Sequence, residues 1–159
     1  MQGEQVTALL AEFRAAGLRA WVAGGWAVDA LVGRVTRPHG DLDLAVDAAQ
    51  QADLLALLGR LGFAITVDWL PVRAELTAPD GRRVDLHPVV FHPDGSGVQA
   101  GLDGAEFRYA ADGFASGAVG GRAVPCLSAA QQLRFRTGYP LRDVDHHDLA
   151  LLRPLTSAG

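Results

Sequence analysis

The strongest constraint on the fold is a short segment, Asp41 to Val46, in which the character of the side chains alternates strictly. Successive side chains of a β-strand point to opposite faces of the sheet. The two leucines and the valine of this segment therefore share one face, and Asp41 and Asp43 share the other. The segment predicts a strand that directs two carboxylates to the same side of a sheet.

Helical and strand patterns are mixed along the rest of the chain without strict alternation. Apolar spacing and turn signals predict helices over 6–13, 26–31, from Asp47 to Gly62, over 128–135 and from Asp143 to a stop at Pro154. They predict strands over 18–23, 63–69, 72–77 and 82–90, and two short strands within 91–121. This order indicates an α/β or α+β fold with a short mixed sheet flanked by helices and with C-terminal helices.

Length and composition limit the organisation of the chain and its chemistry. With 159 residues and 49% apolar content, we expect one domain over 1–159, with a core over about 18–125 and a helical part over about 126–154. The sequence has no Lys, which excludes Schiff-base chemistry and a phosphate-loop lysine, and its one Cys excludes an internal disulfide. The N-terminus lacks the pattern of a signal peptide, and no apolar run is long enough to span a bilayer, so we expect a cytoplasmic protein without membrane contact.

The net charge of the chain limits the kinds of partner that we expect it to bind. A formal net charge of −4 argues against extended electrostatic binding of nucleic acid, but it is compatible with a small, local anion-binding site. We therefore expect small-molecule partners, with a homodimer left open.

A third carboxylate follows the Asp pair. Asp85 lies in the predicted strand 82–90, on the face opposite Val84 and Leu86. If the two strands are neighbours, Asp41, Asp43 and Asp85 converge on one face. Close carboxylates repel each other when ionised, and a divalent cation relieves this repulsion. Oxygen ligands without a nearby Cys favour Mg²⁺ or Mn²⁺.

A phosphate site is predicted just upstream of the carboxylates. Gly24 and Gly25 lie at a strand end that opens a helix, where a residue without Cβ permits close approach and backbone N–H groups favour an anion. Arg34 and Arg37, in the loop before Asp41, could reach the same phosphates. A polyphosphate, a metal ion and three carboxylates together indicate metal-assisted transfer of a phosphorus group.

Each of these signals has a simpler interpretation. An isolated Asp-x-Asp is most often a solvated strand face, a Gly-Gly pair is usually a turn, and Asp85 could pair with Arg82 or Arg83 on the surface. The order of the signals and their placement on strands favour a site.

The segment GGWAVDALVGRVTRPHGDLDLAV, followed by RRVDLHPV, resembles the signature of the DNA-polymerase-β nucleotidyltransferase superfamily. The longer match, with the tail VPCLSAAQQLRFRTGYPLRDVDHHDLALL, is similar to the lincosamide nucleotidyltransferases and the aminoglycoside-2''-adenylyltransferases. The resemblance implies the nucleotidyltransferase fold. It also implies Mg²⁺-dependent transfer of a nucleoside monophosphate, AMP from ATP, to a hydroxyl of a small molecule such as an antibiotic.

The resemblance also implies roles for individual residues. Gly24 and Gly25 would hold the triphosphate, Asp41 and Asp43 would bind one or two metal ions, and Asp85 would complete the metal site and act as general base. Two alternatives remain: a toxin-like nucleotidyltransferase that acts on tRNA or protein, and a degenerate nucleotide-binding module of the same fold.

A few other residues are interpreted in more than one way or placed in the core. His87 shares the Asp85 face and could line the site, whereas Trp26 and Trp69 are expected to pack in the core or at its rim. Asp145 and Asp148, on one face of the last helix, are interpreted as a solvated ladder, a site for a cationic acceptor or a contact across a dimer.

Overall fold

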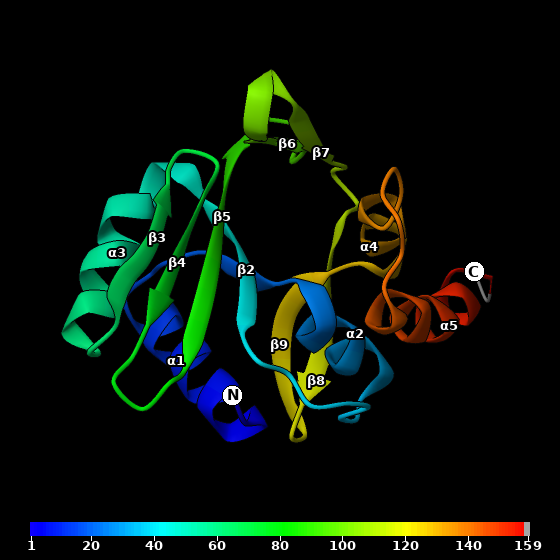
Figure 1. The fold of residues 1–159 in the computed structure, drawn as a ribbon, viewed down its shortest axis with the longest axis horizontal. Coiled ribbons are helices and arrows are strands. Elements are labelled where there is room, and N and C mark those ends of the chain that lie inside the picture. The colour runs from blue at the N-terminus through cyan, green and yellow to red at the C-terminus, as the bar shows by residue number, and fades with distance from the viewer. Residues whose placement is uncertain (158–159) are drawn as a thin grey trace.

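The computed structural model describes residues 1–157, and it contains a mixed sheet covered by helices (Figure 1). The helices are α1 (Gly3–Ala15), α2 (Gly24–Val32), α3 (Gln51–Arg60), α4 (Ala129–Phe135) and α5 (Asp143–Ser157), with short 3₁₀ turns η1 (Ala48–Gln50) and η2 (Leu102–Gly104). The strands are β1 (Ala20–Val22), β2 (Leu42–Asp47), β3 (Ala64–Trp69), β4 (Arg73–Thr77), β5 (Arg83–Phe91), β6 (Gly97–Ala100), β7 (Glu106–Tyr109), β8 (Phe114–Val119) and β9 (Arg122–Leu127).

The strand order places the predicted catalytic strands side by side. The main path runs β3-β4-β5-β2-β1-β9-β8, with β6 paired to the end of β5 and β7 paired to β6. The β2–β5 and β1–β9 pairs are parallel, and the other pairs are antiparallel. The predicted mixed sheet is therefore confirmed.

The alternation that predicted β2 reflects burial on one face of the sheet. Leu42, Leu44 and Val46 are fully buried and pack in the main core with residues of α1 and α3. Figure 1 shows these two helices side by side next to β3, β4 and β5. Because successive side chains of a strand point to opposite faces, Asp43 and Ala45 of β2 are directed away from these helices, to the opposite face of the sheet.

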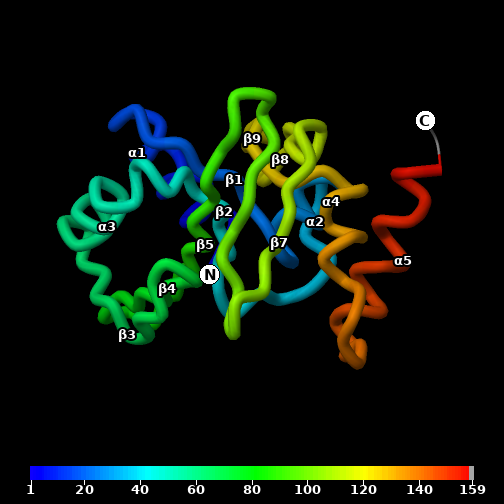
Figure 2. Tube along the Cα trace, turned by 90° about the horizontal axis from the view of Figure 1, so that it is seen from above, coloured from blue at the N-terminus to red at the C-terminus, as the bar shows by residue number. Residues whose placement is uncertain are grey.

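The opposite face is covered in part by the β6–β7 hairpin and α4. A second, smaller apolar cluster contains Ala45, Val89, Tyr109 and Leu127, with Phe135 of α4 packed against it. Figure 2 shows the hairpin crossing in front of the sheet, with α3 on one side and α4 and α5 on the other. A cavity between these parts is lined by residues of this face.

The structure corrects several predicted boundaries. α2 begins at Gly24, two residues earlier than predicted, and α5 continues through Pro154 to Ser157. Residues 91–121 hold three strands, β6, β7 and β8, where two were predicted. Ser128 caps α4 as predicted, but the Gln131 side chain bonds the backbone of residues 108 and 110, so the capping box is wrong.

Within residues 1–157, every helix is too short or too polar to cross a membrane.

Candidate active site

Two carboxylates lie side by side at the centre of the sheet. In the parallel pair of β2 and β5, Asp43 is directly opposite Asp85. Val84 and Leu86, which flank Asp85 on β5, are fully buried on the other face of the sheet. The condition for the carboxylates to converge, that the two aspartate-bearing strands are neighbours, is therefore met, and strand pairing alone fixes the closeness of these two side chains.

A third potential ligand joins the pair. Asp43, Asp85 and His87 each offer one atom, and the three atoms lie within 4.8 Å of one another. One oxygen of Asp85, Oδ1, is buried and has no hydrogen-bond partner among the described residues. Two carboxylates with a free oxygen suit a hard divalent cation such as Mg²⁺ or Mn²⁺, so the donor set fits the predicted metal.

Asp41 lies at the margin of this group. It precedes the first residue of β2 and does not belong to the three-residue cluster. Burial raises the pKa of Asp41 and the negative charge of Asp43 raises it further, whereas Arg83 lowers it. Asp41 thus lies within electrostatic reach of Asp43, and its role as a metal ligand stays a prediction.

Arg73 supplies the positive charge beside Asp85. Its guanidinium, on β4, forms an ion pair with Asp85 and lies 4.8 Å from the centre of the Trp69 ring. Asp85 is only 7% exposed, while Arg82 pairs with Asp80. The interpretation of Asp85 as a surface residue paired with a neighbouring arginine of its own strand is therefore wrong.

His87 is held in one orientation by a chain of hydrogen bonds. Its Nε2 lies 3.4 Å from Asp43, and its Nδ1 lies 3.2 Å from the amide nitrogen of Gln99. Gln99 also donates to the carbonyl of Val72, and its amide oxygen accepts from the Tyr109 hydroxyl at 2.8 Å. Because an amide nitrogen can only donate, Nδ1 must accept and Nε2 carries the proton. His87 therefore donates toward Asp43.

Burial and charge act together on these groups. Burial raises the pKa of Asp85, and the neighbouring His87 and Arg73, which lower it, only partly offset this effect. For His87, burial lowers the pKa, but the hydrogen bond to Asp43 and the nearby carboxylates raise it more, so its pKa is raised overall. A carboxyl whose proton affinity is increased by desolvation is a candidate proton acceptor.

The glycine pair is explained by two close approaches. Gly24 has a φ of +58°, and a Cβ there would overlap the Asp43 carboxylate. A Cβ on Gly25 would overlap the Arg37 guanidinium and lie 2.6 Å from Nδ1 of His39. Gly24 thus makes room for the Asp43 carboxylate, and Gly25 makes room for the loop 33–40.

The two predicted phosphate-binding arginines lie in different surroundings. Arg34 is exposed and lies outside the cavity described below. Arg37 forms a two-point ion pair with the buried Asp148 of α5, at 3.1 and 3.2 Å. Asp148 also accepts from Arg136 at 2.8 Å. Arg37 thus links the loop beside Gly25 to α5, and a phosphate role for either arginine stays a prediction.

A cavity of about 600 Å³ opens over the carboxylate face. Its residues come from the sheet, from the β6–β7 segment and from α4, α5 and the segment between them, which Figure 1 shows arranged around the sheet. Apolar and aromatic side chains predominate in its lining: Trp69, Val72, Leu102, Phe107, Tyr109, Leu127, Phe135 and Tyr139. The polar residues of the lining include Asp43, His87, Arg73, Gln99, Gln132, Arg136, Arg142 and Asp145.

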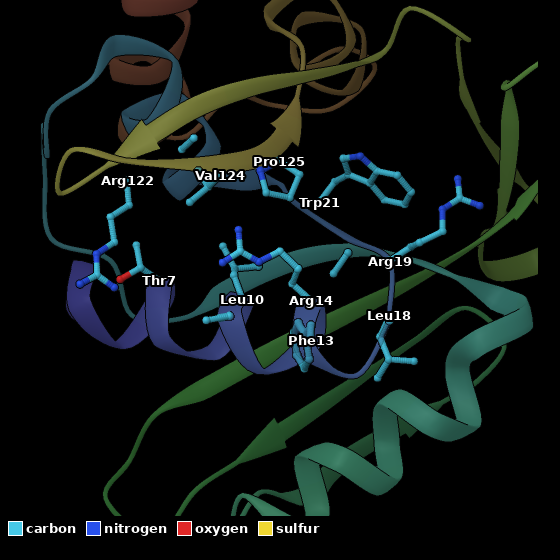
Figure 3. Close-up of a pocket in the computed structure, with 14 residues that line it drawn as sticks. Thr7, Leu10, Phe13, Arg14, Leu18, Arg19, Trp21, Arg122, Val124 and Pro125 are labelled. Atoms are coloured by element: carbon cyan, nitrogen blue, oxygen red, sulfur yellow. The ribbon is translucent and has the colours of Figure 1, made fainter.

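A second cavity, of about 640 Å³, lies between α1, β1 and β9 (Figure 3). Its apolar lining includes Leu10, Phe13 and Pro125, and Arg14 and Arg122 lie at its edge. None of the described residues that line it is Asp, Glu or His, so it lacks the groups needed for a metal ion or a proton acceptor.

Several site residues were not predicted from the sequence. Arg73, Gln99, Gln132 and Arg136 reach the site from strands and a helix distant in the chain, and each is unremarkable in its local sequence. The interpretation of Asp145 and Asp148 as a solvated ladder is wrong, because both are buried and paired with arginines. Trp69 is half exposed at the cavity, whereas Trp26 is in the core.

Comparisons with known proteins agree with this geometry. A family model described as aminoglycoside-2''-adenylyltransferase matches residues 5–152. A lincosamide resistance protein of Staphylococcus haemolyticus is 36% identical over 136 residues, which cover 86% of this chain and 84% of that protein. A 2''-aminoglycoside nucleotidyltransferase of Klebsiella pneumoniae is 46% identical over a shorter stretch of 46 residues, 29% of this chain and 26% of that protein.

Solved structures of other proteins share the fold of this chain. The lincomycin-bound crystal structure of the lincosamide antibiotic adenylyltransferase LnuA has a TM-score of 0.84 at 33% identity, covering 94% of this chain and 95% of that one. The structure of ANT(2'')-Ia in complex with adenylyl-2''-tobramycin has a TM-score of 0.77 at 23% identity, covering 99% of this chain and 89% of that one. The second likeness concerns the fold alone.

Proposed function

Because the chain belongs to the aminoglycoside-2''-adenylyltransferase family and is a nucleotidyltransferase, we propose that it transfers AMP from ATP, with Mg²⁺, to one hydroxyl of a lincosamide-type antibiotic. The observation that carries the proposal is the register of β2 and β5, which places Asp43 opposite Asp85 beside the cavity.

The lining of the cavity favours an amphipathic acceptor over a polycation. An aminoglycoside carries several positive charges and needs several free carboxylates to replace its water. Only two of the lining residues are acidic, Asp43 and Asp145, and Asp145 is already paired with Arg142. Large apolar surfaces with few polar groups suit a molecule such as lincomycin, which has an apolar part, several hydroxyls and one basic amine.

Asp43 and Asp85, with Asp41, would hold the metal ion. When bound, the ion would neutralise negative charge on the phosphates. In the proposed reaction the acceptor hydroxyl attacks the α-phosphorus, a new O–P bond forms, the α–β bridging bond breaks and pyrophosphate leaves. Asp85 takes the hydroxyl proton, for which its buried, unpartnered Oδ1 is suited. His87 donates toward Asp43 and keeps that carboxylate oriented.

The acceptor assignment is tested by a side-by-side reaction. Purified protein is incubated with ATP, Mg²⁺ and either lincomycin or tobramycin, and the acceptor mass and pyrophosphate release are measured. We expect lincomycin to gain one AMP unit and tobramycin to react at least about 100-fold more slowly, because unpaired charges must be buried. Faster adenylylation of tobramycin would contradict the proposed acceptor while leaving nucleotidyl transfer intact.

A further inference from the structure

We infer that Gln132 of α4 and Arg136, the residue that follows α4, bind the β- and γ-phosphates of the nucleotide, and hence the departing pyrophosphate, beside the start of α2. The inference rests on the proposed function, because it assigns residues to the triphosphate of that reaction. It adds two phosphate ligands to the predicted ones, Arg34 and Arg37.

The first argument is that both side chains carry buried donors without partners. Gln132 is 1% exposed, and its Nε2 makes no hydrogen bond within residues 1–157. The Nε of Arg136 is likewise buried and unpartnered in that range, and the Arg136 side chain is 8% exposed. Buried donors are nearly always paired, so two orphaned donors one helical turn apart indicate an absent ligand. A ligand that only accepts hydrogen bonds, such as a phosphate, would pair with both the Gln132 Nε2 donor and the Arg136 Nε donor.

The charge balance of the same cluster points to an anion. Arg37 and Arg136 both pair with a single carboxylate, that of Asp148, which is 2% exposed. The Gln132 amide oxygen accepts from Arg136 at 3.2 Å and adds no charge. The cluster therefore holds two positive charges against one negative charge, with Arg136 and Asp148 buried and Arg37 partly exposed. An excess positive charge away from water is stabilised by a bound anion.

The position of the cluster agrees with the geometry of the proposed reaction. Gln132 and Arg136 line the same cavity as Gly24 and Asp43. Gly24 is the first residue of the nine-residue helix α2, and a helix start carries free N–H groups and partial positive charge. Helix α2 contacts both α4 and α5. The phosphates would thus extend from Asp43 toward α4, which leaves the aromatic lining for the acceptor.

The decisive variant is Gln132→Glu. A glutamate keeps the size of the side chain and the oxygen that accepts from Arg136, but it replaces the free donor with a negative charge. Its new pairing with Arg136 supports the fold while it repels a phosphate. Arg134→Gln is the matched control, because Arg134 is exposed on the same helix and the change alters the net charge by the same one unit.

The experiment measures binding by calorimetry, with magnesium pyrophosphate and AMP as separate probes, and lincomycin is titrated as well. For Gln132→Glu we expect the Kd for pyrophosphate to rise at least about tenfold, the effect of losing a hydrogen bond to a charged group. The Kd for AMP should stay within about twofold, and the Arg134→Gln variant should match the wild type with both probes. Gln132→Met, which lacks the amide donors but adds no charge, should also weaken pyrophosphate binding by about tenfold and carries the test if the glutamate variant does not fold.

Two results would overturn the assignment. One is pyrophosphate binding within about threefold of wild type in both Gln132 variants. The other is weakened lincomycin binding with unchanged pyrophosphate binding, which would place these residues in the acceptor site. Failure of the proposed nucleotidyl transfer itself looks different, because the wild-type protein would then bind neither magnesium pyrophosphate nor ATP.

Discussion

Gly24 shows how one residue without a side chain makes room for a carboxylate of the candidate site. Its positive φ is strained for any other residue type, and the space where a Cβ would lie is taken by the Asp43 carboxylate. The two effects can be separated, because Gly120 has nearly the same φ, +57° against +58°, with nothing within 4 Å of the position that a Cβ would occupy.

Gly24→Ala and Gly120→Ala should therefore lose similar stability but differ in activity. We expect each to lower the free energy of unfolding by about 1–2 kcal/mol through backbone strain. Only Gly24→Ala should slow nucleotidyl transfer, by about 10²-fold, because it displaces Asp43. Urea unfolding and the rate of pyrophosphate release measure the two effects. Equal rates in both variants would show that the carboxylate tolerates the displacement.

The sequence predicted individual residues only where a local rule applied. Alternation on a strand was enough to place Asp43 and Asp85 on one face, with His87 beside them. The partners of a long side chain depend on distant segments, so the binding of Arg37 to Asp148, 111 residues away, has no local signal. For the same reason the orphaned donors of α4 could not be predicted.

At the scale of elements, several hydrogen bonds to the Asp145 carboxylate hold the start of α5. Asp145 accepts from the backbone and the guanidinium of Arg142, at 2.9 and 3.0 Å, and from the Tyr139 hydroxyl at 3.3 Å. The hydrogen bond from the Arg142 side chain is the main cause that lowers the pKa of Asp145 from 3.8 to about 2, against the opposing effect of burial.

This lowered pKa makes a prediction about acid stability. A carboxyl with a lower pKa in the folded state contributes stability above its unfolded pKa of 3.8, and the contribution is lost as the pH falls toward about 2. The free energy of unfolding of Asp145→Asn should therefore be lower than that of the wild type at neutral pH, and the gap should narrow as the pH falls below about 4. Denaturant unfolding across this range checks it, with Asp112→Asn, an exposed position, as control. A constant gap at all pH values would contradict the ionic role.

The elements that the sequence predicted well have a strong one-sided pattern. The buried faces of α1, β2 and β5 were evident from apolar spacing. Within residues 91–121, β6 and β7 have four residues each and depend on the end of β5 for their pairing, whereas β8 pairs with β9. Pro154 lies inside α5 because a proline removes only one donor, and the helix continues for three residues beyond it.

At the scale of the molecule, the site depends on how distant parts of the chain meet. The resemblance to antibiotic nucleotidyltransferases is confirmed by the family match and by LnuA. Local patterns predicted the sheet but not its strand order, which requires long-range pairing. The cavity is formed by the sheet, the β6–β7 segment and the two C-terminal helices together. Its aromatic lining, on which the acceptor proposal depends, appears only when these parts assemble.

The central claim is that Asp85 acts in the transfer step beside Asp43. Single-turnover transfer of AMP to lincomycin, measured for the wild type and Asp85→Asn together with the Kd for Mg·ATP, tests it most directly. Asparagine keeps the shape but loses the proton acceptor and a charge, so we expect a rate about 10²–10⁴-fold lower with ATP binding within about tenfold. A variant rate within a few-fold of the wild type would remove Asp85 from the mechanism.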